Sequence, residues 1–252
     1  MNLALVHSRA RTGVRAPEVR VEVHLGGGLP TMSIVGLPEA AVREAKDRVR
    51  AAMQCAQFEF PQRRITVNLA PADLPKGGGR FDLPIALGIL AASGQIPLQA
   101  LGEYEFLGEL GLTGELRVVD GVLPAALAAA DAGRKLIVPA GNGAEAALAS
   151  QVEAYTARTL LEVCAMLTGS KTLPGAIAPE QQRGLRCDLA DVRGQAHARR
   201  ALEIAAAGRP HQEYVVLPGG RDFQRAACVR LAAHVGEVAA QAALLFGRDR
   251  AG

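Results

Sequence analysis

Residues 64–93, RITVNLAPADLPKGGGRFDLPIALGILAAS, form the stretch that decides the fold of this 252-residue chain. Apolar and polar side chains alternate from Arg64 to Leu69, which is the period of a half-buried β-strand. A loop rich in proline and glycine follows from Ala70 to Asp82, and the apolar run Leu83 to Ser93 predicts a helix. The order strand, loop, helix predicts helices layered on a sheet.

Strands and helices alternate on both sides of this stretch. On the N-terminal side we expect strands at 19–25 and 32–35, then a helix opened by Pro38 and Glu39. Glu44 and Arg48, four residues apart and opposite in charge, place one face of that helix in water. On the C-terminal side the predicted strands are 104–107, 116–119 and 135–138, and the predicted helices are 122–132, 145–150 and 159–167.

The composition excludes several classes of protein. With 49% hydrophobic and 21% charged residues, the chain is neither disordered nor a collagen or disulfide scaffold. Its net charge of +3 is too small to indicate nucleic-acid binding by itself. The longest nearly apolar stretch, Val122 to Ala130, is too short to cross a bilayer, and the N-terminus shows no signal peptide. Four cysteines without CxxC spacing indicate reduced thiols, so we expect a cytoplasmic protein away from membranes.

Five strings together resemble one family: LALVHSR (3–9), IVGLPE (34–39), ITVNLAPADLPK (65–76), GRFDLPIALGIL (79–90) and DVRGQ (191–195). They resemble the ComM (YifB) proteins, bacterial magnesium-chelatase-like AAA+ ATPases. The resemblance implies an α+β fold whose N-terminal part is a two-layer, Lon-protease-like domain of the ribosomal S5 domain-2 type. It also implies an α/β AAA+ module, ATP and Mg²⁺ as cofactors, and a homo-hexamer acting on DNA in branch migration during natural transformation.

The resemblance and the composition divide the chain into three parts. Residues 1–167 are expected to form the Lon-protease-like, ChlI-type domain, and residues 168–186 a linker. The linker assignment depends on the polar, Gly- and Pro-rich string at 169–184. Residues 187–252 are expected to be a truncated, divergent start of the AAA+ module, because the chain has no Ser, Thr or Lys beyond Thr172. A frameshift product and a shortened paralogue remain alternatives for residues 209–252.

Proteolysis is not expected from this Lon-like domain. Lon-type proteases carry a Pro-Lys-Asp-Gly-Pro-Ser string, and here Arg80 stands where the nucleophilic serine would be. A guanidinium stays protonated and cannot attack a carbonyl. Those enzymes also need a lysine on the helix after a Val-Leu-Pro turn, but the residues after Val122-Leu123-Pro124 contain none before Lys135. We therefore assign no catalytic residue, and a Ser-Lys peptidase ranks third among the possible functions.

The loop that replaces the nucleophile allows two interpretations. In the first it is a positive finger that touches DNA or a partner, made of Lys76, Gly77, Gly78, Gly79, Arg80 and Asp82. In the second, Arg80 pairs with Asp82 or Asp73 and anchors the loop locally. A basic face made of Arg43, Lys46, Arg50, Arg63 and Arg64 also suggests DNA, but acidic residues interleave with it and favour a solvated surface.

The nucleotide site of the family falls late in the chain. Val192, Arg193, Gly194 and Gln195 resemble its lead-in, which borders the adenine. The phosphate loop that should follow needs a lysine and a hydroxyl, yet the sequence gives EYVVLPGGRDF at 213–223. We expect no ATP hydrolysis by this chain, no bound ATP or Mg²⁺, and no metal site at His211 or His234. Its predicted role is the N-terminal part of a ComM-type ATPase, and the alternative is a non-catalytic binding or oligomerisation module.

Overall fold

The computed structural model describes residues 2–39, 42, 44–178 and 200. Contacts group residues 1–179 into one compact unit and residues 180–252 into another. The predicted nucleotide-site residues Val192, Arg193, Gly194 and Gln195 lie outside the described residues, as does the tail 209–252. The fold that follows is that of the N-terminal unit.

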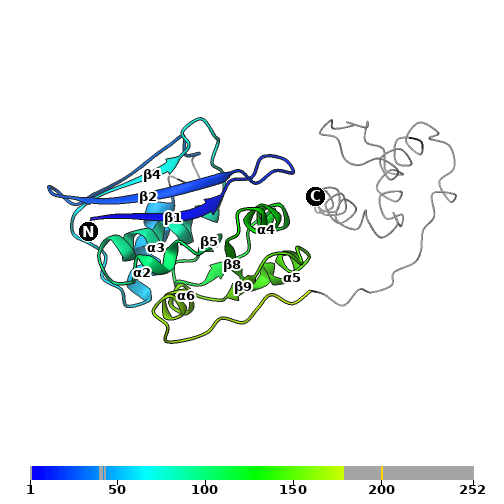
Figure 1. The fold of residues 1–252 in the computed structure, drawn as a ribbon. Helices are drawn as coiled ribbons and strands as arrows, with labels where there is room; N and C mark the ends of the chain where they lie inside the picture. Colours follow the sequence, from blue (N-terminus) through cyan, green and yellow to red (C-terminus); the bar gives the residue numbers. More distant parts are fainter. Residues whose placement is uncertain (1, 40–41, 43, 179–199, 201–252) are drawn as a thin grey trace, which may run out of the picture. The chain divides into compact units, whose positions relative to one another are not determined.

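A seven-stranded mixed sheet runs through this unit in the order β3-β4-β2-β1-β5-β8-β9 (Figure 1). β2 is antiparallel to both of its neighbours, and the remaining neighbours are parallel. The strands are β1 (Leu3–Arg9), β2 (Glu18–Gly26), β3 (Thr31–Val35), β4 (Arg64–Ala70), β5 (Tyr104–Phe106), β8 (Lys135–Pro139) and β9 (Ala154–Ala157). A separate small hairpin pairs β6 (Glu109–Leu110) with β7 (Leu116–Arg117).

Five named helices lie among the described residues: α2 (Ala45–Cys55), α3 (Asp82–Ala92), α4 (Val122–Asp131), α5 (Gly143–Ala146) and α6 (Leu160–Leu167). Every residue of α3 is buried, because this apolar helix packs on β1 and β2 while α2 packs on its other side. The predicted apolar helix is therefore confirmed, and its full burial accounts for its apolar composition.

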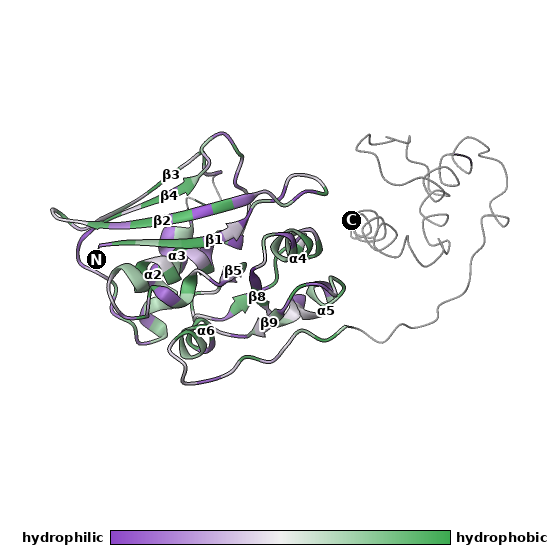
Figure 2. Cartoon of the chain, viewed as in Figure 1, coloured by the Kyte–Doolittle hydropathy of each residue, from purple (hydrophilic) through white to green (hydrophobic). Residues whose placement is uncertain are grey.

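The two halves of the sheet are covered differently. Along β2 the valines and leucine are buried while Arg20 and His24 are exposed, so this half has one face in water. Figure 2 shows the matching alternation of hydropathy along β2. In β8, by contrast, each residue from Leu136 to Pro139 is buried, so both of its faces are covered.

Buried polar groups join the two halves where β1 meets β5, a junction with a single residue pair, His7 and Glu105. The Ser8 hydroxyl donates to the Phe106 carbonyl at 2.9 Å. Arg9 donates to the Glu105 carboxylate through Nε at 2.6 Å and Nη2 at 2.7 Å. Arg134 adds a third hydrogen bond to Glu105, from Nε at 2.9 Å. Glu105 is fully buried. We call Arg9, Glu105 and Arg134 together the Arg9–Glu105 clamp.

Most of the predicted elements are confirmed to within about two residues. The strand expected at 116–119 is shorter, at Leu116–Arg117, and the helix expected at 145–150 is the short α5. Pro38 forms a β-bridge with Lys76, Val42 is helical and α2 is described from Ala45. Because residues 40, 41 and 43 lie outside the described residues, the predicted start of this helix at Pro38 and Glu39 stays a prediction. Neither β1 nor β9 was predicted.

The mixed α+β character is thus confirmed, while the likeness to the Lon protease domain stays a prediction. Part of the expected linker packs against the fold: the Thr156 amide donates to the Pro174 carbonyl at 2.9 Å, and the Ala176 amide to Ala154 at 2.8 Å. Within the described part of the chain, no helix has the length and apolarity needed to cross a membrane.

Candidate functional site

Two loops leave the sheet together at the ends of the parallel strands β3 and β4. Gly36 follows β3 with φ of +98°, and a Cβ atom there would overlap the Leu69 backbone, so only glycine lets the strands approach this closely. Beyond it, the Glu39 amide donates to the Lys76 carbonyl at 3.0 Å. This backbone pairing fixes the glycine-rich loop against the loop after β3.

Arg80, which stands where the Lon-type resemblance would place a nucleophile, points into the fold. The residue is 4% exposed, and its guanidinium donates to the Arg9 carbonyl at 3.4 Å and to the Asp120 carbonyl. Burial, with Arg11 nearby, lowers the pKa of Arg80 to about 10. Arg80 is anchored, as the second interpretation expected, but by backbone carbonyls instead of Asp82 or Asp73.

Lys76, the other cation of the loop, is fully buried, and its ammonium donates to the Pro71 carbonyl. Desolvation lowers the pKa of Lys76, an effect that Asp73 partly opposes. Neither Lys76 nor Arg80 therefore forms the exposed finger of the first interpretation. Contact between this loop and DNA stays a prediction that the geometry does not favour.

Two of the loop's glycines are required by packing, and the third by its backbone conformation. A Cβ atom on Gly77 would lie 2.5 Å from a carboxylate oxygen of Glu39, and one on Gly79 would overlap the carboxylate of Glu109. Gly78 adopts a φ of +74° beside open space. Two carboxylates therefore flank the loop, and they would repel a phosphate placed there.

Asp82 begins α3 and binds Arg48 of α2. The aspartate is buried and accepts from Arg48 Nε at 2.7 Å, from Arg48 Nη2 at 3.0 Å and from the Leu110 amide at 3.2 Å. Burial raises the pKa of Asp82, and the hydrogen bonds from Arg48 oppose that shift. The predicted pair of Arg48 with Glu44 is longer, at 3.9 Å. Asp82 thus ties α2, α3 and the β6 segment together.

No proteolytic pair is present among the residues that the structure describes. None of their hydroxyl groups is hydrogen-bonded to a lysine or histidine, and Ser93 donates to the Leu90 carbonyl at 3.0 Å. α4, where a Lon-type base would lie, has only apolar residues and Asp131. In the same part of the chain no group of three or more His, Cys, Asp or Glu could hold a metal ion.

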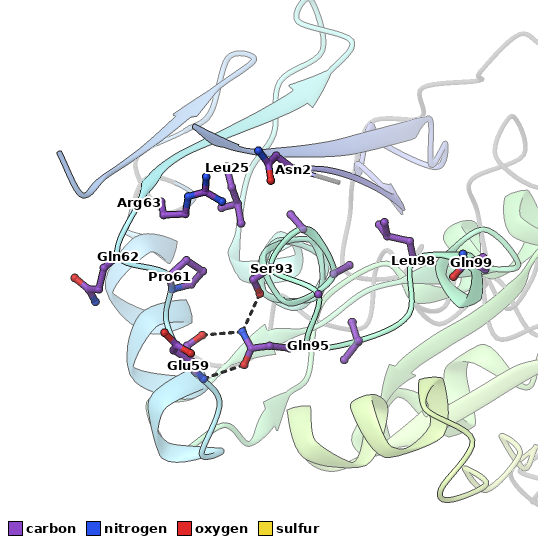
Figure 3. Close-up of a pocket in the computed structure, with 14 residues that line it drawn as sticks. Asn2, Leu25, Glu59, Pro61, Gln62, Arg63, Ser93, Gln95, Leu98 and Gln99 are labelled. Atoms are coloured by element: carbon purple, nitrogen blue, oxygen red, sulfur yellow. Dashed lines mark hydrogen bonds between the residues drawn. The ribbon is translucent and has the colours of Figure 1, made fainter. Parts of the chain in front are cut away.

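Two hollows lie beside the turn from α2 to β4. The larger, about 570 Å³, has both neutral and charged polar residues on its wall, Glu59 and Arg63 among them. The Gln95 amide there donates to the Glu59 carbonyl and to Ser93 (Figure 3). The smaller, about 250 Å³, has Lys46 and Arg50 on its wall. Both hollows share the segment from Pro61 to Arg63.

The sequence offered little to predict several of these contacts. The four-residue spacing of Glu44 and Arg48 predicts an exposed ion pair, whereas the closer partner, Asp82, lies 34 positions away in the chain. No sequence pattern around Glu39 or Glu109 predicts that their carboxylates contact Gly77 and Gly79. The sequence identifies Lys46, Arg50 and Arg63 as basic residues. It does not predict that they line one hollow, because that depends on the turn at Phe60 and Pro61.

Comparison with known proteins first shows the class of protein to which this domain is similar. Residues 21–142 match the family model described as subunit ChlI of Mg-chelatase, which makes this part of the chain magnesium-chelatase-like. The chain is 52% identical over 225 residues to the "Competence protein ComM" of Haemophilus influenzae. It is 48% identical over 221 residues to the "Uncharacterized protein YifB" of Escherichia coli, and 41% over 225 residues to an uncharacterized protein of Mycobacterium tuberculosis.

These matches also identify the family. Each alignment covers 87% of this chain and 44% of the relative. The chain belongs to the ComM/YifB family of magnesium-chelatase-like proteins. It spans less than half of the length of the relatives it matches.

Proposed function

We propose that residues 1–178 form the N-terminal, non-proteolytic domain of a ComM-type AAA+ ATPase that drives DNA branch migration during natural transformation. The observation that carries this proposal is the 52% identity with the competence protein of Haemophilus influenzae over 225 residues. The buried, carbonyl-bound Arg80 supports the non-proteolytic part, because no nucleophile occupies its position.

In the assembled motor, ATP and Mg²⁺ would bind to the AAA+ module, and the functional unit would be a cytoplasmic homo-hexamer on DNA. The residues from 173 to 252 contain no lysine, serine or threonine to hold a phosphate or its metal ion. We therefore assign to this chain a positioning role without its own ATP hydrolysis. The Lon-protease-like, two-layer description of the domain belongs to the same proposal.

A chimera tests the role of the domain. Residues 1–178 would replace the matching part of the Haemophilus influenzae competence protein in a strain that lacks it. Transformation by a chromosomal marker should return to within a few fold of the native level, while uptake of a replicating plasmid reports on competence itself. A chimera that accumulates normally but transforms no better than the deletion strain would contradict the proposal.

A second measurement tests the lack of ATPase activity. The purified 252-residue chain would be incubated with labelled ATP, with and without Mg²⁺. We expect no Mg²⁺-dependent binding above that of a matched protein without a nucleotide site. Tight Mg²⁺-dependent binding, or hydrolysis, would overturn this part of the proposal.

A further inference from the structure

The smaller hollow is a basic cleft between α2 and the turn that leads into β4. Of the ten described residues that line it, three are basic and one is acidic: Pro30, Thr31, Met32, Lys46, Asp47, Arg50, Phe60, Pro61, Gln62 and Arg63. Lys46 and Arg50 lie four residues apart on α2 and so share one face of the helix. Arg63, in the segment that leads into β4, lines the same hollow. Positive charge from two separate elements therefore converges on one concave surface.

These three cations are not neutralised within the described fold. No carboxylate among the described residues lies within 4.0 Å of the charged groups of Lys46, Arg50 or Arg63. By contrast, Arg9, Arg48 and Arg134 each bind a carboxylate. Arg50 and Arg63 are also exposed, so their charges face solvent and can meet a ligand. Unpaired cations in a cleft attract a polyanion more strongly than scattered surface charges do.

Arg50 is held in place by an aromatic ring. Its guanidinium lies 5.0 Å from the centre of the Phe60 ring, and Phe60 itself is 9% exposed. The ring contact holds the guanidinium beside the cleft, and Arg50 is exposed, so the guanidinium remains accessible to a ligand. Arginine planes of this kind stack on unpaired bases in complexes with single-stranded nucleic acid. In a duplex the bases are already stacked on each other and paired, so they are not offered to such a plane.

We propose that this cleft binds the sugar-phosphate backbone and an unpaired base of single-stranded DNA. Lys46 and Arg63 contact phosphates, and Arg50, backed by Phe60, stacks on a base. The strand lies across the Pro61–Arg63 segment, whose far side faces the larger hollow (Figure 3). Arg63 lines both hollows, and Glu59 adds a negative charge on the side of the larger one. The proposal rests on the proposed function, since branch migration presents unpaired strands.

The test measures binding of a fluorescein-labelled 20-nucleotide oligothymidylate to the complete 252-residue chain by fluorescence anisotropy. With Lys46 and Arg63 each neutralising one phosphate and a slope of about −0.7 per contact for single strands, affinity should fall about 7-fold between 50 and 200 mM salt. Each of Lys46→Ala, Arg50→Ala and Arg63→Ala should weaken binding about 5-fold, and the triple variant about 100-fold. Arg63→Glu should weaken it further than Arg63→Ala.

Arg20→Gln is the matched control, because Arg20 is exposed on β2 and pairs in register with Ala70, at the opposite end of β4 from Arg64. It should change the affinity less than 2-fold. Thermal unfolding of each variant checks that the fold is retained. Loss of affinity in Arg20→Gln equal to that in Arg63→Ala, or a triple variant within 2-fold of the parent chain, would overturn the cleft as the site.

Two further probes assign the ligand. A 20-base-pair duplex should bind at least 10-fold more weakly than the single strand, and equal binding would overturn the single-strand assignment. Oligouridylate should bind no more tightly than oligothymidylate, and tighter binding would assign the cleft to RNA instead. Failure of the chimera in transformation would reject the proposed function while leaving this binding result intact, so the two failures can be told apart.

Discussion

The Arg9–Glu105 clamp provides the sharpest test of how the sheet is held together. Glu105→Gln keeps the size of the side chain but removes the negative charge that accepts three hydrogen bonds from Arg9 and Arg134. Removing one partner of a buried ion pair typically costs about 3–5 kcal/mol, because the remaining charge is left buried. The same loss would remove a large part of the roughly 5–15 kcal/mol that stabilises a domain.

The lower end of that range is expected here. Arg9 would keep the carbonyls of Ala16 at 3.2 Å and Ala128 at 2.9 Å, and Arg134 would keep Glu18 at 3.0 Å. A loss of about 3 kcal/mol corresponds to a fall of roughly 6–12 °C in the midpoint of thermal unfolding for a domain of this size. The assay is a thermal melt followed by circular dichroism, supported by urea titration.

Two companions make the test decisive. Glu103→Gln changes an exposed acid just before β5 and should shift the free energy of unfolding by no more than about 0.5 kcal/mol. The double variant Arg9→Met with Glu105→Leu removes both charges and should cost less than Glu105→Gln alone. An unfolding midpoint of Glu105→Gln equal to that of the Glu103→Gln control would contradict this prediction, as would a double variant that is the least stable of the three.

Three further predictions concern the backbone at Gly36, the Asp82 carboxylate and the Cys164 thiol. Gly36→Ala should destabilise the protein by about 3 kcal/mol, because the new Cβ would overlap the Leu69 backbone and alanine is strained at positive φ. Gly27→Ala is the control, because a Cβ there would meet open space, and urea titration should show it to be nearly neutral. Because burial raises the folded-state pKa of Asp82 above the unfolded value of about 3.9, its stabilising contribution is complete below pH 3.9 and lost as pH rises through the folded pKa. The cost of Asp82→Asn should therefore shrink between pH 3 and 6, and growth over that range would show that Arg48 dominates. Burial raises the pKa of Cys164 to about 12, so only about one thiol in 10⁴ is ionised at pH 8; peptide mapping after brief alkylation should find exposed Cys55 modified and Cys164 intact.

Elements with a regular pattern and a single role could be predicted from the sequence. β2 alternates because one of its faces is wet, and α3 is apolar throughout because all of its faces are covered. The sequence does not predict β1, because Leu3 and Leu5 are apolar although their side chains are exposed. The strand therefore lacks the alternation of apolar and polar residues that is typical of a half-buried strand. β9 is only four residues long, too short for any period to emerge.

The contacts of the candidate site depend on residues that are distant in the chain. Asp82 finds Arg48 thirty-four positions away, and Arg80 finds the carbonyl of Asp120 forty positions away. No local spacing rule reaches that far, so the sequence pairs Arg48 with Glu44 and offers Arg80 only Asp82 or Asp73 as an anchor. The charges of the basic cleft could be predicted from the residue types, but their convergence could not.

The segment at 173–176 has a practical meaning for anyone who handles this domain in solution. By pairing with the outer strand β9, it covers backbone donors and acceptors that would otherwise stand open at that border of the sheet. Open borders of this kind recruit strands from neighbouring molecules and lead to aggregation. A fragment cut before Leu173 would therefore be expected to precipitate at concentrations where one that ends at Ala178 stays dispersed.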